Sequence, residues 1–307
     1  MRVDDGIAKK KLLVFGGSGY VGRHLLHALG TQRALGTYFQ HPFPGGVRFD
    51  PDRTRVADLL QKGDSFSHAL LLLNSGSIDS VATHRQTAHL ANVTNLIDII
   101  DQLFTLGIKP VFASSDAVFD GTKGNYTEED ARNPLLVYGV HKAIVEEYLQ
   151  QQPNPNYLIV RLSKVYGVAR HDRTLFTQWV DDIQNGTPLR LAWDQRFSPV
   201  FVEDVVAGLL ALIHHDLSGL FHLSGPESFS RVELFGLLTA RLRDRFGDIP
   251  QVPIQICRIN DLNFVETRPI DCSMNSSKLV RAVGLSLHSA ASCCQTLVDS
   301  LPAWPPR

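Results

Sequence analysis

The 307-residue sequence lacks an excess of charge of either sign, with 30 lysines and arginines against 31 aspartates and glutamates. It also has no long block of one charge, which would be typical of a protein that coats DNA or binds a membrane surface. No apolar run is long enough to cross a bilayer. These absences exclude nucleic acid and membranes as expected partners and favour small molecules or other proteins.

The sequence also has few cysteines, and it shows no sign of a targeting segment. The run LLVF after Lys9–Lys11 is too short for a signal peptide and has no small-residue cleavage site. The cysteines show no ligand-like pairing with histidines, which fits reduced thiols in a cytoplasmic protein and excludes a disulfide framework. His214 and His215 end a helical pattern, where they complement the helix dipole, so we predict no metal site. The four cysteines all lie late in the chain, at Cys257, Cys272, Cys293 and Cys294.

Short apolar runs alternate with helix-length stretches along the first half of the chain. Since the runs are apolar throughout, they are typical of a parallel sheet covered by helices on both faces. The sequence therefore predicts an α/β fold of the Rossmann type, with a doubly wound parallel sheet. After Gly167 the alternation of apolar runs and helical stretches becomes less regular. FHLSGPES resembles one more core strand. No clean linker separates the two parts of the chain. The expected strands contain KLLVF, LGTYF, HALLLLN, PVFASS and NYLIVRLS.

The stretch Lys11–Gly30 passes from an apolar run through glycines into an amphipathic pattern. A strand that turns sharply into a helix needs one glycine at the turn and a second where the backbone approaches a pyrophosphate. A third lets the helix pack against the strand. Gly16, Gly19 and Gly22 have this spacing and this context. The loop fits neither a Gly-x-Ser-x-Gly nucleophile nor a nucleoside triphosphate loop. It therefore predicts a dinucleotide-binding site.

Tyr138 and Lys142 lie four residues apart in YGVHK, within a helical pattern, and project from one helix face. A neighbouring ammonium lowers the pKa of a tyrosine by favouring the phenolate, so we expect the pair to exchange a proton near neutral pH. Upstream, VFASSDAVFDG ends an apolar strand at the sheet edge where ligands bind. There Ser115 is placed to hydrogen-bond a carbonyl oxygen. Alone, Tyr-x-x-x-Lys is also common on solvated helices.

A series of motifs from about Lys11 to Leu285 carries a resemblance to a known family. They include GGSGYVG, ANVTNL, SSDAVFDG, YTEEDARNPLLVYGVHK, RLSKVYG, DQRFSPVFVEDVV and RPIDCSMNSSKL. On these motifs the chain resembles the extended short-chain dehydrogenases/reductases, and within them the dTDP-4-dehydrorhamnose reductase family. The resemblance implies an NAD(P)H-dependent reductase of a keto group on a sugar nucleotide or a related sugar-like metabolite.

The resemblance also implies roles for individual residues. Tyr138 would donate the proton, Lys142 would hold the nicotinamide ribose and depress the tyrosine pKa, and Ser115 would polarise the carbonyl. Substrate contacts are expected from Ser115, Asp116, Lys164 and Arg268. Cofactor contacts are expected from Gly16, Ser18, Gly19, Tyr20, Val21, Gly22, Tyr38, Asp50, Asn74, Ser75, Gly76, Asn92, Tyr138 and Lys142.

The chain departs from the family pattern at positions expected to face the substrate. Ala117 stands where a tyrosine is usual, Lys164 where a tryptophan is usual, and Leu175-Phe176 where an Asn-Phe pair often touches the nucleotide diphosphate. Losing two aromatic platforms removes stacking area. Lys164 adds a cation that either meets a carboxylate or phosphate or points to water. Asp116-Ala117 also lacks the Asp-Glu pair of a dehydratase. We therefore expect a reductase whose substrate differs from the standard deoxysugar nucleotide.

The choice of cofactor depends on the end of the second strand. NAD enzymes usually carry an acidic residue about 20 positions beyond the glycine loop, but TYFQHPF has none near Tyr38 to His41. A 2′-phosphate would meet no repulsion there, and Arg23 or His41 could attract it, so NADP is preferred over NAD. Asp50 is expected either to contact the adenine or to serve as a turn or N-cap residue.

Residues 8–165 are predicted to form the NAD(P)-binding domain, joined by residues 197–225. Residues 166–196 and 226–307 are predicted to form a smaller, interleaved substrate-binding region. Two alternatives to a reductase stay open. The first is a non-catalytic, NADP-binding regulatory subunit resembling that of methionine adenosyltransferase, and the second is a sugar-nucleotide epimerase of the same superfamily. A cytoplasmic homodimer is expected.

Overall fold

The structure is a computed structural model that describes residues 11–302. Residues 8–10 of the first predicted domain and residues 303–307 of the second lie outside this described part. Within residues 11–302, no helix is both long enough and apolar enough to cross a membrane.

Seven strands form one parallel sheet in the order β11-β6-β5-β4-β1-β2-β3. The chain winds outward from β1 to β3, returns beside β1 as β4 and continues outward to β11, which is the doubly wound arrangement. The predicted fold is confirmed, and the strand expected in FHLSGPES is the edge strand β11. The strands are β1 (Lys11–Phe15), β2 (Ala34–Tyr38), β3 (Val47–Arg48), β4 (Phe66–Leu71), β5 (Lys109–Ser115), β6 (Leu158–Leu162) and β11 (Gly219–Leu223).

Both faces of the sheet are buried because helices cover each of them, and successive side chains of a strand point to opposite faces. Leu12 and Val14 of β1 join one buried cluster, which is completed by α1 and α7. Leu13 and Phe15 join another, which is completed by α4 and α5. This two-sided burial explains why the strands are apolar throughout rather than alternating.

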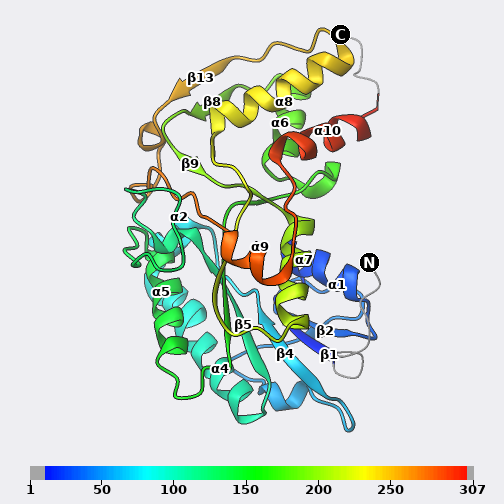
Figure 1. The fold of residues 1–307 in the computed structure, drawn as a ribbon, viewed down its shortest axis with the longest axis vertical. Helices are drawn as coiled ribbons and strands as arrows, with labels where there is room; N and C mark the ends of the chain where they lie inside the picture. The colour runs from blue at the N-terminus through cyan, green and yellow to red at the C-terminus, as the bar shows by residue number, and fades with distance from the viewer. Residues whose placement is uncertain (1–10, 303–307) are drawn as a thin grey trace.

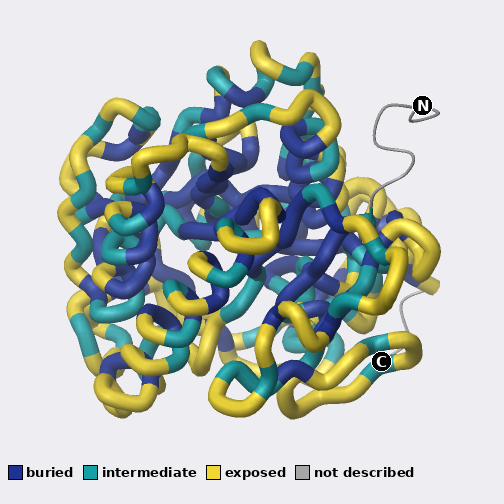
Figure 2. The backbone as a smooth tube through the Cα atoms, turned by 90° about the horizontal axis from the view of Figure 1, so that it is seen from below, coloured by how far each residue is buried: buried dark blue, intermediate teal, exposed yellow. Residues whose placement is uncertain are grey.

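Helices cover the sheet in two layers, with α1 and α7 on one side and α4 and α5 on the other (Figure 1). Figure 2 shows the buried backbone running through the middle of the molecule and the exposed segments around it. The helices of these layers and their short neighbours are α1 (Tyr20–Leu29), α2 (Ile78–Thr83), α3 (Arg85–His89), η2 (Leu90–Thr94), α4 (Asn95–Thr105), α5 (Val137–Gln150), α7 (Val202–His214) and α9 (Ser277–Val283), with η1 (Val56–Leu59) and η3 (Asp116–Val118).

The helical stretch before β5 contains an irregularity that the sequence did not predict. Between α3 and α4, residues Leu90–Thr94 form a π-helical turn, η2. Such turns insert an extra residue into a helix and are frequent at functional sites. Asn92 lies in this turn and is buried.

A third buried cluster forms away from the sheet, around α6, α8 and α10. In Figure 1 these helices and the pair β8–β13 gather at the end of the molecule opposite α4. The chain enters this region after β6, leaves it for α7 and β11, and enters it again after β11. The division predicted at residues 166–196 and 226–307 stays a prediction. Its elements are β7 (Val165–Tyr166), η4 (Arg170–Asp172), α6 (Leu175–Asn185), β8 (Leu189–Ala192), β9 (Arg196–Phe197), β10 (Val200–Phe201), β12 (Phe229–Ser230), α8 (Arg231–Phe246), β13 (Ile254–Cys257), η5 (Ile259–Asp261) and α10 (Ala290–Ser300).

Candidate active site

Two neighbouring cavities open at the carboxyl ends of the central strands. The glycine-loop cavity, of about 300 Å³, is bounded by the loop between β1 and α1. The outer cavity, of about 510 Å³, is bounded by the ends of β5 and β6, the start of α8 and the segment around η5. Both are lined by Asn74, Ser115, Tyr138, Ser163 and Val165. The two cavities therefore meet at one junction, where groups of two bound molecules can react.

The three predicted glycines differ in what the backbone around them requires. Gly16 has φ 83°, and a Cβ there would lie 2.8 Å from the carbonyl oxygen of Leu72. At Gly22 a Cβ would lie 2.3 Å from the carbonyl oxygen of Gly16, so only glycine lets α1 pack this close. Gly19 is exposed, and its Cβ would meet only the Gly16 oxygen, at 3.2 Å. It leaves bare backbone at the N-terminus of α1, which fits a phosphate group.

Ser115, Tyr138 and Lys142 come together at the junction. Ser115 ends β5, while Tyr138 lies in the first turn of α5 and Lys142 one turn further on. The buried Lys142 Nζ donates a hydrogen bond to the carbonyl oxygen of Ala113 at 2.9 Å and lies 5.7 Å from the centre of the Tyr138 ring. The lysine is thus held between the strand and the tyrosine, facing the glycine-loop cavity.

The prediction that Lys142 lowers the pKa of Tyr138 is wrong. Burial and the charge of Asp116 raise the pKa of Tyr138 to about 12, and the Ser115 hydroxyl acts only weakly in the other direction. Burial also lowers the pKa of Lys142 to about 8, against the charge of Glu146. Desolvation outweighs the attraction expected between phenolate and ammonium because both groups are enclosed. Tyr138 therefore keeps its proton at neutral pH.

A buried ionic network lies behind Lys142 on the same helix. Glu146 is fully buried and accepts hydrogen bonds from Arg161 Nε at 2.9 Å and Nη2 at 2.6 Å. It also accepts one from the Ser114 hydroxyl at 2.5 Å. The network ties α5 to β5 and β6 next to the junction, so it fixes where Tyr138 and Lys142 stand.

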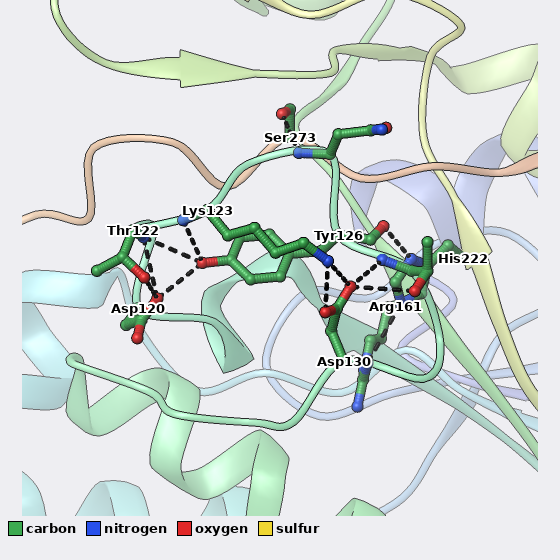
Figure 3. A network of polar contacts seen from close by, with 10 residues as sticks. Asp120, Thr122, Lys123, Tyr126, Asp130, Arg161, His222 and Ser273 are labelled. Carbon is green, nitrogen blue, oxygen red and sulfur yellow. Dashed lines mark hydrogen bonds and ion pairs between the residues drawn. The ribbon is translucent and has the colours of Figure 1, made fainter.

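The network continues from Arg161 into the loop that follows η3 (Figure 3). Arg161 can only donate, so His222 Nε2 accepts its hydrogen bond at 3.2 Å, and Nδ1 donates to the Tyr126 carbonyl at 3.1 Å. Burial lowers the pKa of His222 to about 3, which agrees with this neutral form. The Tyr126 hydroxyl donates to Asp120 at 2.7 Å and accepts from the backbone of the same loop. The loop is thereby anchored to the sheet.

All four predicted substrate residues line the outer cavity, namely Ser115, Asp116, Lys164 and Arg268. Asp116 accepts hydrogen bonds from Ser115 Oγ at 2.9 Å and Ser163 Oγ at 3.2 Å. Burial raises its pKa to about 6, while the two serines and the charge of Lys164 act in the other direction. The carboxylate is therefore held against the junction.

Sequence reasoning missed Arg231, the first residue of α8, which also lines the outer cavity. Its guanidinium lies 5.6 Å from the centre of the Phe197 ring. It lies in GLFHLSGPESFSRVEL, which also resembles the family, but it was assigned no role because it enters the cavity only through the packing of the second region. Leu175 and Phe176 line neither cavity and are buried in the cluster around α6.

The predicted cofactor residues fall into two groups. Of those assigned, Gly16, Gly19, Tyr20, Val21, Gly22, Asn74, Tyr138 and Lys142 line the glycine-loop cavity, and Gly76 lines the outer one. Ser18, Tyr38, Asp50, Ser75 and Asn92 line neither.

The structure shows other contacts for two residues of the second group. The Asn92 side chain accepts a hydrogen bond from the Ser75 backbone at 2.7 Å, so it holds the loop after β4 from behind. Asp50 accepts from the backbone of Asp52 at 3.2 Å, which is the contact expected of a turn residue.

Within residues 11–302, no group of three or more His, Cys, Asp or Glu residues is placed to hold a metal ion. The four cysteines are free thiols and are buried. The groups that gather at the junction are hydroxyls and an ammonium, which donate hydrogen bonds, and a carboxylate, which accepts them. Such groups suit proton transfer and hydrogen bonding to a carbonyl compound.

Comparison with known proteins places this site in a family. Residues 10–301 match the family described as RmlD substrate binding domain. The dTDP-4-dehydrorhamnose reductase of Sinorhizobium fredii is 25% identical over 73% of this chain and 77% of its own. The methionine adenosyltransferase 2 subunit beta of Bos taurus is 33% identical over 58% of this chain and 57% of its own.

A solved structure supports the same assignment at the level of the fold. The dTDP-4-dehydrorhamnose reductase of Bacillus anthracis in complex with NADP superposes with a TM-score of 0.79 at 20% identity, covering 95% of this chain and 100% of that one. The fold and the motifs thus agree with the family match. The chain belongs to the RmlD substrate binding domain family, and the resemblance to dTDP-4-dehydrorhamnose reductases expected from its motifs is confirmed.

Proposed function

We propose that this protein is an NAD(P)H-dependent reductase of a keto group on a sugar nucleotide or a related sugar-like metabolite. The observation that carries the proposal is the junction, where Ser115 and Tyr138 face both cavities and Lys142 faces the glycine-loop cavity. A dinucleotide in the first cavity and a carbonyl compound in the second would meet beside these groups. The reductase relatives support the same reaction class.

The residues of the glycine-loop cavity fit a dinucleotide. The exposed Gly19 lets a pyrophosphate approach the N-terminus of α1, and a larger residue would fill that space. When bound, the reduced nicotinamide supplies a hydride. Lys142 would hold the nicotinamide ribose, because its ammonium faces this cavity beside Tyr138.

Tyr138 would supply the proton to the carbonyl oxygen. A pKa of about 12 keeps its hydroxyl protonated at neutral pH, so the proton that a reduced carbonyl needs is in place. Ser115 would orient the substrate by hydrogen-bonding the same oxygen. Its hydroxyl now donates to Asp116 and would have to turn toward the substrate.

The proposal is tested by mixing the purified protein and NADPH with a panel of keto-sugars, with and without a nucleotide. We expect loss of NADPH absorbance with at least one substrate that has a keto group beside a hydroxyl-bearing carbon. Absence of oxidation across the whole panel, in a protein that still binds NADPH, would contradict a reductase.

We also propose NADPH as the preferred cofactor. No carboxylate follows β2 to repel a 2′-phosphate, and the exposed Arg23 lies on α1. NADPH should bind at least as tightly as NADH. The difference in affinity between the two should shrink at high salt, because screening weakens the attraction between the 2′-phosphate and nearby cations. Calorimetry at two salt concentrations measures both, and tighter binding of NADH at low salt would contradict the preference.

A regulatory subunit is the second candidate, favoured by the 33% identity to the bovine methionine adenosyltransferase 2 subunit beta. The substitutions at Ala117 and Lys164 point the same way, since they alter the wall that a family substrate would touch. In that case the chain would bind NADPH, reduce nothing in the panel and co-elute with a methionine adenosyltransferase catalytic subunit. The four cysteines, free and buried, fit a cytoplasmic role for either candidate.

A further inference from the structure

The outer cavity carries more positive than negative charge. Lys164, Arg231 and Arg268 line it, and Asp116 is the one acidic residue among its described lining residues. We refer to the three cations as the cationic corner. They come from three separate places in the chain: the end of β6, the first residue of α8 and the segment after η5.

The chain leaves this positive charge largely unpaired. Within residues 11–302, the side chains of Lys164 and Arg231 make no hydrogen bond and no ion pair. Arg268 donates from Nη2 to Asp79 at 2.7 Å, but its Nη1 is buried without a partner in the described chain. The Arg268 side chain is only 8% exposed, and its guanidinium lies 4.4 Å from the centre of the Phe264 ring.

Keeping a buried cation without a full set of partners costs free energy, and this applies most to Arg268, which is buried. Arg231 is half-buried and Lys164 is exposed at the mouth of the cavity, where partial desolvation lowers the pKa of both and the charge of Arg231 lowers that of Lys164 further. An anion between them would remove this cost and would accept the hydrogen bonds that are free to be made. A cavity wall of this kind is therefore suited to a negatively charged ligand group.

The position of Lys164 relates this charge to the reacting end of a ligand. Its neighbours Ser163 and Val165 both line the junction, and its ammonium feels the charge of Asp116, which is bonded to Ser115. A group held by Lys164 thus lies close to the carbonyl expected at Ser115 and Tyr138.

We propose that the cationic corner binds an anionic group, a carboxylate or a phosphate, on the sugar-like part of the substrate next to the reduced carbonyl. The proposal rests on the proposed reductase function for the location of the carbonyl, but binding of the anion can be measured without turnover. Arginine offers a planar pair of donors that fits either oxyanion, and lysine adds a mobile point charge.

The experiment compares ligands that differ by one anionic group, using calorimetry on the NADPH-loaded protein. Glucuronate against glucose tests a carboxylate, and glucose 6-phosphate against glucose tests a phosphate. We expect at least one charged probe to bind about tenfold or more tightly than glucose, as charge-assisted hydrogen bonds would produce. Which probe binds more tightly identifies the anion.

Variants separate the corner from general charge attraction. Lys164→Gln and Arg231→Gln should each remove most of the preference for the charged probe, and Lys164→Arg should keep it. Lys62→Gln, at an exposed lysine that lines neither cavity, makes the same change in net charge and should leave the preference intact.

Equal affinity for the charged and neutral probes, including no measurable binding of either, would overturn the anion site. So would a preference that survives Lys164→Gln and Arg231→Gln combined. Failure of the reductase is read separately, as absence of NADPH oxidation across the keto-sugar panel, and can occur while the charged probes still bind at the corner.

Discussion

The glycine-loop cavity and the outer cavity meet at one junction but are built differently. The first is formed by a continuous stretch of backbone, from β1 through the glycines into α1, with help from the ends of neighbouring strands. The second is assembled from segments far apart in the chain. Side-chain networks such as that around Tyr126 and Arg161 hold distant segments of this fold together (Figure 3). A local backbone requirement leaves a sequence motif, whereas a wall made by long-range packing does not.

The largest expected effect is at the ionic network behind the junction. Glu146→Gln would leave Arg161 buried beside a neutral amide, and breaking a buried pair costs about 3–5 kcal/mol. Urea unfolding should therefore show a large loss of stability. Glu147→Gln is the matched control, since Glu147 is exposed on the same helix, and it should change stability little. Equal stability of the two variants would mean that the network does not anchor α5.

The next effect separates the two cavities. Gly19 has φ −70°, which any residue adopts, so Gly19→Val should stay folded while its side chain occupies the pyrophosphate space. We expect NADPH affinity to fall by about a hundredfold or more, given the loss of charge-assisted hydrogen bonds to phosphate. Gly236→Val, where a Cβ would meet open space, should leave affinity unchanged. Unaltered NADPH binding by calorimetry in Gly19→Val would remove the assignment of this cavity.

The first cavity could be predicted from the sequence because the need for glycine is local. Gly16 must adopt a positive φ, and Gly22 must admit a neighbouring carbonyl, so each position constrains its residue type directly. The same holds for Tyr138 and Lys142, whose spacing places them on one helix face. The π-helical turn around Asn92 was not predicted, since nothing in ANVTNL distinguishes it from regular helix.

Only some of the residues that line the outer cavity could be predicted from the sequence. Lys164 and Arg268 came from the resemblance to a family, but Arg231 enters the cavity only once α8 packs onto the second region. The pKa of Tyr138 was predicted in the wrong direction. The spacing of Tyr138 and Lys142 shows only that an ammonium is near the phenol. The burial of the phenol and the nearby charge of Asp116, which raise its pKa, are seen only in the folded structure.

The smallest expected effect concerns the loop after η3, which contains Lys123 and Asp130. The Lys123 ammonium and the Thr127 backbone lower the pKa of Asp130 to about 2, so the folded state binds fewer protons than the unfolded state below about pH 4. Its contribution to stability is therefore present above that pH and is lost as pH falls toward 2. Lys123 is exposed, and surface pairs contribute only about 0–1 kcal/mol.

Asp130→Asn should accordingly flatten the fall in stability between about pH 4 and pH 2, measured by thermal unfolding. Asp248→Asn, at an exposed aspartate outside this loop, should not. If Asp130→Asn leaves the acid profile unchanged, the pair does not hold the loop.

The central claim is that bound NADPH reduces a carbonyl at the junction and that Tyr138 supplies the proton. It is tested most directly by single-turnover oxidation of bound NADPH on the best substrate of the panel, comparing the wild type with Tyr138→Phe. The phenyl ring still packs, so NADPH affinity should persist, while the rate should fall by roughly a hundred- to ten-thousandfold, the usual worth of general acid catalysis. Equal rates for the two proteins would contradict the account.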